Sequence, residues 1–432
     1  MKLYSEGKSY KLYNGNMLDM LEAIQPNSID AVVTDPPYEI GFMNRAWDGS
    51  GIAFQVATWE KCLTVLKPGG YLLAFGAPRN FYRMACAIED AGFEVRDVIM
   101  WLYGSGMPKG MNIGLMVDKK NGVESEIVGY QDSTMPDFVD AGQKNVANGG
   151  ANKVGFNPGE TADRKQMPIY KVHNRWDGWN TTLKPSYEPI IMARKPCEGS
   201  CIDNVMKWEV GGINIDECRV SLESNYVYKE TNRHSRECNV FTGDTCGFDS
   251  ANNHTASANP DGRYPANVIL SYDDSDREEV CGGMPYTVST GGSGEASQGF
   301  SGNIYGKYNH DKPISHLGGL GDEGSTARYF YCAKASNRDR DEGLGDSERN
   351  IHPTVKPTDL MQYLIRLVTP QGGIILDPFN GSGSTGKAAM YENYDRDAGY
   401  KYIGIELTQE YLPIADARIR YVENTPKQFK LF

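Results

Sequence analysis

Hydrophobic and polar positions follow two different rhythms along the first hundred residues. Short apolar runs bounded by proline or glycine predict buried strands at Ile29–Val33 and Tyr71–Phe75. Apolar residues at helical spacing predict helices over Phe54–Leu66 and Phe81–Ala91. A further strand is predicted for Phe93–Tyr103. Alternation of strand and helix is typical of a parallel sheet covered by helices.

The same alternation returns near the end of the chain. The pattern predicts a helix over Thr358–Val368, a strand at Ile374–Asp377, a helix after Ser384 and a strand at Tyr402–Glu406. Both ends of the chain therefore contribute to one α/β domain. The predicted fold is a doubly wound, mainly parallel sheet with helices on both faces.

The middle of the chain lacks this rhythm. Stretches rich in Gly, Asn, Ser and Asp separate short apolar pieces there, at Ser133–Glu160, Thr242–Gly262 and Ser289–Tyr308. This composition predicts an insert with long surface loops. We therefore expect three parts, with boundaries at 1–103, 104–348 and 349–432.

Composition narrows the class of protein. The 432 residues are 40% hydrophobic, and no apolar run approaches the roughly 18 to 20 residues of a membrane span. The first residues are polar and do not resemble a signal peptide, so we expect a cytoplasmic protein. The formal net charge of −12 argues against nucleic-acid binding through the overall field of the protein. A nucleic-acid contact would need a local patch, for which Lys165–Arg175 and Lys184–Lys195 are candidates.

The nine cysteines indicate reduced thiols better than a disulfide framework. A zinc site is the alternative, and its candidate ligands are Cys197, Cys201, Cys218, His234, Cys238 and Cys246. Their spacing is irregular, without the paired Cys-x-x-Cys knuckles of most structural zinc sites. We therefore expect no metal.

The first candidate site is Asp35-Pro36-Pro37-Tyr38, at the carboxyl end of a predicted strand. Alone, this tetrapeptide could equally be a rigid turn. Chemistry offers a sharper hypothesis, because a carboxylate and a proline-fixed carbonyl can accept both N–H bonds of an exocyclic base amine. That would direct the nitrogen lone pair toward a methyl donor. Tyr38 would stack on a base rotated out of the duplex.

The second candidate site is a glycine-rich turn after the strand at Ile374–Asp377. Its residues are Asp377, Phe379, Asn380, Gly381, Ser382 and Gly383. Glycines there let a ligand approach the backbone, and Glu406 ends the next strand, where a carboxylate can bind ribose hydroxyls. The turn also resembles a phosphate-binding loop through Lys387, but Ala388 stands where that loop needs a hydroxyl.

A third segment, His352-Pro353-Thr354-Val355-Lys356-Pro357, precedes a predicted helix. In this chain order the three segments resemble the DNA amino-methyltransferases that act on adenine N6 or cytosine N4, in the subgroup called class beta. The resemblance implies that Asp35, Pro36, Pro37 and Tyr38 are catalytic. It also implies an S-adenosylmethionine site lined by Asp377, Phe379, Asn380, Gly381, Ser382, Gly383 and Glu406, with Thr354 and Lys356 closing over it.

The resemblance further implies that the insert recognises the target in duplex DNA and that no metal takes part. Short stretches of the insert, such as Pro185–Pro189, are similar to phage and prophage members. Family members often carry Asp where this chain has Asn16, and that Asp can contact the adenine of the cofactor. An amide can also hydrogen-bond an adenine, so the substitution concerns this one contact.

Several functional hypotheses stay open. Asp at position 35 favours adenine N6, since family members acting on cytosine more often carry Ser there, and cytosine N4 is the principal alternative. An inactive DNA-binding protein of the same fold is a second alternative, and methylation of RNA or protein is a third. A homodimer and a cognate restriction endonuclease are compatible with the resemblance.

Overall fold

The computed structural model describes most of the two ends of the chain and parts of its middle. The described residues are 2–41, 46–103, 110–132, 166–220, 262–272, 284, 286–288, 323–325, 327, 330–334, 337–345 and 348–426. The chain divides into two compact units. Unit 1 combines Met1–Gly104 with Tyr187–Phe432, and unit 2 is Ser105–Ser186.

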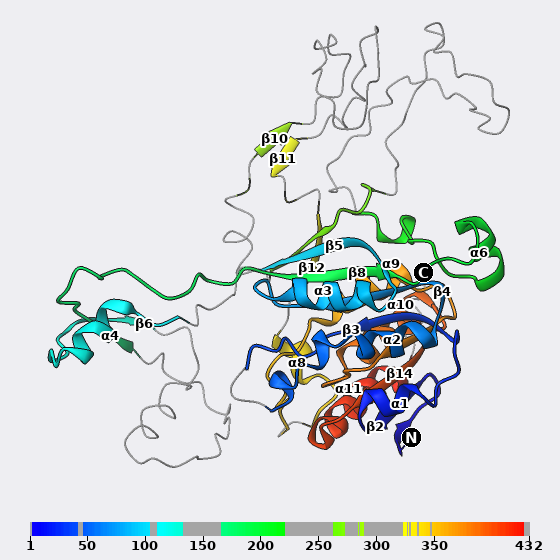
Figure 1. Ribbon diagram of the computed structural model, residues 1–432, viewed down its shortest axis with the longest axis horizontal. Helices are drawn as coiled ribbons and strands as arrows, with labels where there is room; N and C mark the ends of the chain where they lie inside the picture. The colour runs from blue at the N-terminus through cyan, green and yellow to red at the C-terminus, as the bar shows by residue number, and fades with distance from the viewer. Residues whose placement is uncertain are drawn as a thin grey trace, which may run out of the picture. The chain divides into compact units, whose positions relative to one another are not determined.

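Unit 1 is built on a ten-stranded sheet of order β1-β2-β14-β13-β3-β4-β8-β5-β9-β12 (Figure 1). Its strands are β1 (Lys2–Glu6), β2 (Tyr10–Asn14), β3 (Ile29–Thr34), β4 (Leu66–Phe75), β5 (Glu94–Tyr103), β8 (Tyr187–Arg194), β9 (Val268–Tyr272), β12 (Tyr331–Lys334), β13 (Ile374–Asp377) and β14 (Lys401–Glu406). β1 is antiparallel to β2, and β8 is antiparallel to both of its neighbours. The other neighbours are parallel, which confirms the predicted mainly parallel sheet.

Helices cover both faces of the sheet. One face carries α1 (Met17–Leu21), α2 (Val56–Val65) and α3 (Phe81–Asp90), and the other carries α9 (Thr358–Val368), α10 (Ser384–Arg396) and α11 (Leu412–Asn424). Alternate residues of β3 serve the two cores: Ala31 and Val33 face the core of α9, whereas Val32 faces that of α2. This two-sided burial explains the continuous apolar runs in the sequence. None of the helices in the described ranges is long and apolar enough to cross a membrane.

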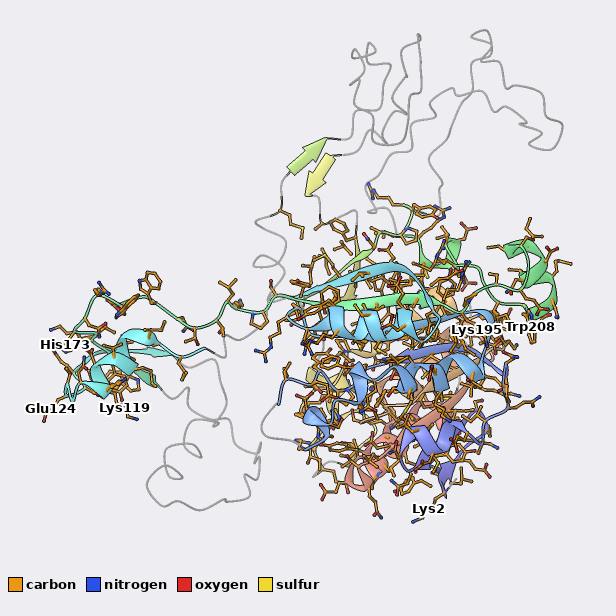
Figure 2. All side chains as sticks on the ribbon, in the orientation of Figure 1. Lys2, Lys119, Glu124, His173, Lys195 and Trp208 are labelled. Atoms are coloured by element: carbon orange, nitrogen blue, oxygen red, sulfur yellow. The ribbon has the colours of Figure 1, made fainter. Side chains whose placement is uncertain are left out.

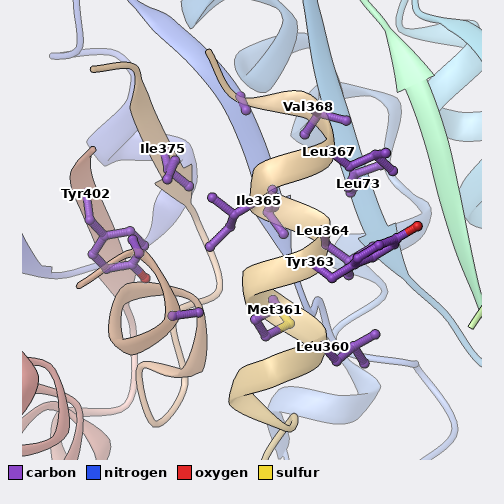
Figure 3. Close-up of a cluster of buried hydrophobic side chains, with 14 of the residues drawn as sticks. Leu73, Leu360, Met361, Tyr363, Leu364, Ile365, Leu367, Val368, Ile375 and Tyr402 are labelled. Atoms are coloured by element: carbon purple, nitrogen blue, oxygen red, sulfur yellow. The ribbon is translucent and has the colours of Figure 1, made fainter. Parts of the chain in front are cut away.

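Helix α9 contributes more buried side chains to one core than any other element of that core (Figure 3). Leu360, Leu364 and Ile365 are fully buried, and Met361 is almost so. In Figure 3 these side chains lie between Leu73 of β4 and Ile375 of β13. The helix thereby holds together strands that come from opposite ends of the chain.

The stretch 104–348, expected as a loop-rich insert, also supplies strands to the main sheet. β8, β9 and β12 all lie within it. β8 takes a central position because Ile190–Ala193 is a four-residue apolar run, buried on both faces. The predicted loops at Ser133–Glu160 and Ser289–Tyr308 lie outside the described residues, as does Thr242–Gly262 except for its last residue.

Smaller elements complete the described chain. Unit 2 contains α4 (Ile113–Lys120) and the hairpin β6 (Ile127–Asp132) with β7 (Gln166–Tyr170). The remaining elements are η2 (Ala46–Gly49), η3 (Ile52–Phe54), α6 (Cys201–Trp208), η4 (Asp216–Cys218), β10 (Tyr286–Val288), β11 (Glu323–Ser325), α8 (Asn337–Asp341) and η6 (Gln409–Tyr411).

The strand predicted at Tyr71–Phe75 begins earlier than expected. β4 starts at Leu66 and runs through Lys67-Pro68-Gly69-Gly70. The glycines instead accommodate a shift in the register between β3 and β4. Gly69 has a φ of +81°, and a Cβ there would lie 2.2 Å from the Asn204 amide, so the strand needs glycine.

Replacing Leu364 with Ala should lower the free energy of unfolding by about 2–5 kcal/mol, because it leaves a cavity between α9 and the sheet. Leu407→Ala is the matched control, since that side chain is 65% exposed. It should change stability by less than about 0.5 kcal/mol. Urea unfolding followed by circular dichroism checks both values, and equal losses in the two variants would contradict the packing described.

Candidate active site

The candidate site residues meet at one edge of the sheet. β3, β13 and β14 are parallel neighbours, so their carboxyl ends lie together. Asp35 follows β3, Asp377 ends β13 and Glu406 ends β14. The predicted tetrapeptide and the glycine-rich turn are therefore adjacent, although more than three hundred residues separate them.

Asp35 uses one oxygen and leaves the other without a partner. Its Oδ2 accepts a hydrogen bond from Lys356 Nζ at 2.7 Å. Its Oδ1 is buried and has no hydrogen-bond partner among the described residues. Burial raises the pKa of Asp35, and the positive charge of Lys356 opposes that rise. A buried acceptor without a partner costs free energy, so it marks a position at which a ligand donor is favoured.

The Lys356 ammonium lies among two carboxylates and two rings. Nζ is 3.4 Å from Glu188 Oε2, 5.1 Å from the centre of the Tyr38 ring and 5.0 Å from that of Phe75. Burial alone would lower the pKa of Lys356, but the carboxylates of Asp35 and Glu188 outweigh burial and raise it. The resemblance implied that this lysine closes over the cofactor, whereas the structure places its charged end beside Asp35.

Tyr38 is fixed at both ends. Its hydroxyl donates to Glu188 Oε2 at 2.6 Å, and its carbonyl accepts from Asn80 Nδ2 at 2.6 Å. Tyr103 also donates to Glu188, at 3.5 Å. Hydrogen bonds at both ends therefore hold the ring of Tyr38 in one place.

The segment after the tetrapeptide is anchored by carboxylates. Asp48 accepts hydrogen bonds from the backbone of Glu39 and Ile40, and Glu39 accepts one from Gly51 at 2.7 Å. Pro36 is buried and Pro37 half-buried. These contacts fix the direction of the chain on leaving β3, as a rigid cradle requires.

Asp377 is fully engaged in internal hydrogen bonds. Its Oδ1 accepts from Thr34 Oγ1 at 2.6 Å and from the Phe379 amide at 3.1 Å, and its Oδ2 accepts from Thr385 Oγ1 at 2.7 Å. Burial raises the pKa of Asp377 to about 6, although these hydrogen bonds oppose the rise. The carboxylate thus joins β3, β13 and α10 directly beneath the site.

The glycine-rich turn is held by Glu406 and Asn380. Glu406 accepts from the Gly381 amide and the Thr408 amide, each at 2.7 Å, and Asn380 Oδ1 accepts from the Tyr402 hydroxyl at 2.8 Å. The Thr408 side chain also hydrogen-bonds to Glu406, whose carboxylate still has acceptor capacity for a ligand. The φ angles of Gly381 and Gly383 are +51° and +77°, a left-handed conformation that favours glycine. The carbonyl of Ser382 accepts from Arg418 at 2.7 Å.

The segment before α9 packs over this turn. A Cβ added to Gly381 would lie 2.9 Å from His352 Nε2, so the imidazole touches the turn. His352 Nδ1–H donates to the Thr354 carbonyl at 3.0 Å, and the ring stacks on Trp47 with the planes 16° apart. Burial lowers the pKa of His352 to about 4, which keeps the imidazole neutral at physiological pH. The Thr354 side chain is exposed.

Lys387, the residue that imitates a phosphate-binding loop, has a structural role. It is fully buried, and its Nζ lies 2.6 Å from Asp339 Oδ1 and 2.9 Å from Glu342 Oε2. These contacts join α10 to α8 and direct the ammonium away from the turn. Lys387 is therefore not available to bind the phosphates of a nucleoside triphosphate at this turn.

The other sequence candidates have ordinary surroundings. Cys197 and Cys201 are free thiols with sulfur atoms 3.9 Å apart, while His234, Cys238 and Cys246 lie outside the described residues. Within the described ranges, no group of three ligating side chains could hold a metal ion. Lys195, labelled in Figure 2, donates to the Leu63 and Leu66 carbonyls. This lysine therefore has a structural role, contrary to its candidacy as a phosphate contact.

Asn16, the departure from the family pattern, is a helix cap. Its side chain accepts a hydrogen bond from the Leu18 amide at 3.0 Å, at the start of α1. Asp performs this function equally well, so the local structure tolerates either residue.

Sequence reasoning missed Glu188, Tyr103 and His352 as site residues. Glu188 lies in the segment Pro185–Pro189, whose similarity to family members carried no role. The available signal was an acidic side chain at the start of an apolar run, since Ile190 follows Pro189 directly. A carboxylate beside a buried strand needs a partner, and here the partner is Lys356.

The sequence of this chain is similar to those of known DNA methyltransferases. Residues 29–417 match the sequence profile of a family described as DNA methylase. A stretch of 120 residues is 30% identical to the Type II methyltransferase M.HinfI of Haemophilus influenzae and covers 28% of this chain. The match spans only 30% of the length of that relative.

Two solved structures are similar over nearly the whole chain. The PvuII DNA methyltransferase (cytosine-N4-specific) is 12% identical with a TM-score of 0.42, covering 98% of this chain and 94% of that protein. The M1.HpyAVI-SAM complex is 14% identical with a TM-score of 0.36, covering 95% and 98%.

The raised pKa of Asp377 predicts a specific pH dependence of stability. Below about pH 4 the carboxyl is protonated in both folded and unfolded chains. Between about pH 4 and 6 only the unfolded chain releases the proton, so this group lowers the free energy of unfolding by up to about 3 kcal/mol. Asp377→Asn has no carboxyl group at this position and should lack this loss of stability. From about pH 4 to 6, its free energy of unfolding should therefore rise relative to that of the unsubstituted protein. Urea unfolding at several pH values checks this, and parallel curves would refute it.

Proposed function

We propose that this chain, which belongs to the DNA methylase family, transfers the methyl group of S-adenosylmethionine to an exocyclic amino group of a DNA base. The observation that carries the proposal is the state of Asp35. Lys356 holds one carboxylate oxygen, and the other is buried at the carboxyl end of β3 without a partner among the residues that the structure describes. A hydrogen-bond donor is favoured there, and the amine of a base would supply one.

The cradle suits activation of a weak nucleophile. The lone pair of an exocyclic base amine is delocalised into the ring, so the nitrogen attacks poorly. Asp35 Oδ1 and the carbonyl of Pro36 can accept its two N–H bonds and localise the lone pair on nitrogen. When the nitrogen takes the methyl group, the methyl–sulfur bond would break, the sulfur would leave as a neutral thioether, and the nitrogen would lose a proton that Asp35 can accept. The ring of Tyr38 provides the stacking surface for a base rotated out of the duplex.

The second half of the site fits the cofactor. S-adenosylmethionine supplies an electrophilic methyl group on a sulfonium centre, so no metal or covalent enzyme intermediate is needed. The residues that would hold it are Phe379 and the backbone of Asn380, Gly381, Ser382 and Gly383, with Glu406 available to ribose hydroxyls. Support comes from the left-handed glycines, which bring the backbone close to a ligand, and from the spare lone pairs of Glu406. Asp377 fixes the start of this turn by accepting a hydrogen bond from the Phe379 amide.

We assign adenine N6 as the target atom and cytosine N4 as the alternative. The assignment rests on the aspartate at position 35, because family members acting on cytosine more often carry serine there. Both amines present the same two N–H donors, and the cradle formed by Asp35 and Pro36 suits either.

Unit 2 is the proposed site of DNA target recognition. It lies within the insert of the methyltransferase domain, and Arg175 lies over the Trp176 ring at 4.8 Å. Trp179 is 56% exposed beside Trp176. Exposed aromatic and guanidinium groups are suited to base and phosphate contacts.

The reaction is tested by identifying its product. The protein is incubated with radiolabelled S-adenosylmethionine and mixed-sequence duplex DNA, and the DNA is digested to nucleosides. We expect the label in N6-methyladenosine. Label in N4-methylcytidine would show that the target is cytosine and leave the mechanism unchanged. Label found only in RNA or protein, offered in parallel, would exclude DNA as the substrate.

Asp35→Asn should lower the methyl-transfer rate on the order of 10²–10³-fold, because the amide cannot accept at both positions as a carboxylate does. Affinity for S-adenosylmethionine, measured by calorimetry, should not change. Asp90→Asn, at an exposed position on α3, is the matched control. Full activity in Asp35→Asn would remove this residue from the mechanism.

A further inference from the structure

Glu188 reaches the site from a strand that the sequence placed in the insert. β8 lies antiparallel between β4 and β5, so its first residues, and not its last, meet the carboxyl end of β4. Glu188 is the second residue of β8 and stands opposite Trp101 of β5. An antiparallel strand is therefore what brings this carboxylate to the catalytic edge.

Glu188 connects three groups of the site. Its Oε2 accepts from the Tyr38 hydroxyl at 2.6 Å and lies 3.4 Å from Lys356 Nζ, and its Oε1 accepts from Tyr103 at 3.5 Å. Its side chain is 19% exposed, and that of Lys356 is 7% exposed. Glu188 thus holds the stacking ring and the lysine that faces Asp35.

The charges of the cluster explain why a second carboxylate is useful. Asp35 alone could form a closed pair with Lys356, in which the ammonium spans both oxygens. Glu188 attracts the same ammonium, and the rings of Tyr38 and Phe75 face it from other sides. Lys356 is thereby kept at Oδ2 of Asp35, and Oδ1 has no partner within the described part of the chain.

We propose that Glu188 is a positioning residue for methyl transfer, which fixes Tyr38 for stacking and holds Lys356 so that one oxygen of Asp35 remains free for the base amine. This inference rests on the proposed function. Glu188 acts through Tyr38 and Lys356, since its hydrogen bonds and ion pair with described residues are to Tyr38, Tyr103 and Lys356.

Two substitutions separate the parts of this role. Glu188→Gln keeps an acceptor for the Tyr38 hydroxyl and removes the charge beside Lys356. Glu188→Ala removes both contacts. Glu94→Gln is the matched control, because Glu94 forms an ion pair with Arg194 at the far end of the same strand, at 2.7 Å.

The pH profile distinguishes positioning from mere support of the fold. The attraction of Glu188 contributes to the raised pKa of Lys356, so Glu188→Gln should let that lysine lose its proton at lower pH. The alkaline limb of the rate profile should then move to lower pH in Glu188→Gln. It should not move in Glu94→Gln.

The experiment measures single-turnover methyl transfer to duplex DNA across pH, with S-adenosylmethionine binding measured separately. We expect a fall of about 10²-fold in Glu188→Ala, the scale of a misplaced catalytic group, with cofactor affinity preserved. In a Tyr38→Phe variant, adding Glu188→Ala should lower the rate by a smaller factor, since the hydrogen bond between Tyr38 and Glu188 is already lost.

The outcomes separate the two proposals. If the unsubstituted protein transfers methyl groups and the alkaline limb of Glu188→Gln stays at the same pH, the role of Glu188 is overturned and the proposed function stands. Absence of methyl transfer to any DNA by the unsubstituted protein overturns the proposed function and this inference with it. If Glu188→Ala does not fold, Glu188→Gln still decides, because it keeps the shape and the hydrogen-bond acceptor.

Discussion

The pairing of β3 with β13 is the constraint on which the rest of unit 1 depends. These parallel neighbours are separated by more than three hundred residues, and side chains lock them at both ends. Asp30 accepts from the Ile374 amide at 2.7 Å, and Thr34 donates to Asp377 at 2.6 Å. Because parallel strands end at the same edge, this one pairing brings the tetrapeptide Asp35–Tyr38 beside the glycine-rich turn after β13. Neither half buries its strand without the other.

The sequence predicts this frame well for a physical reason. Strands buried on both faces are continuous apolar runs, and helices covering a sheet keep a helical period, so β3, β13 and α9 are all visible in the pattern. The edge hairpin β1–β2 is not, because β1 is mostly exposed and carries no apolar run. Asp35 and the glycine turn were also predictable, since each ends a visible strand.

The ion cluster was not predictable because it depends on a strand order that no local pattern encodes. Glu188 reaches Lys356 only because β8 enters the sheet between β4 and β5 in the opposite direction. Lys356 reaches Asp35 from the segment before α9. Three charged residues from distant parts of the chain thus form one cluster, in which a carboxylate that looks incidental in sequence shares the lysine of Asp35.

The attachment of unit 2 has a consequence for how such proteins diversify. The chain leaves the sheet after β5 and returns to it as β8. Leu102 of β5 pairs directly with Tyr187 of β8. Both ends of Ser105–Ser186 are therefore joined to adjacent positions of one strand pair. A segment attached in this way can be exchanged between genes as a single block, with both crossovers at neighbouring points of the fold. Under the role proposed for unit 2, such an exchange would change the DNA target while the sheet and its site are inherited unchanged.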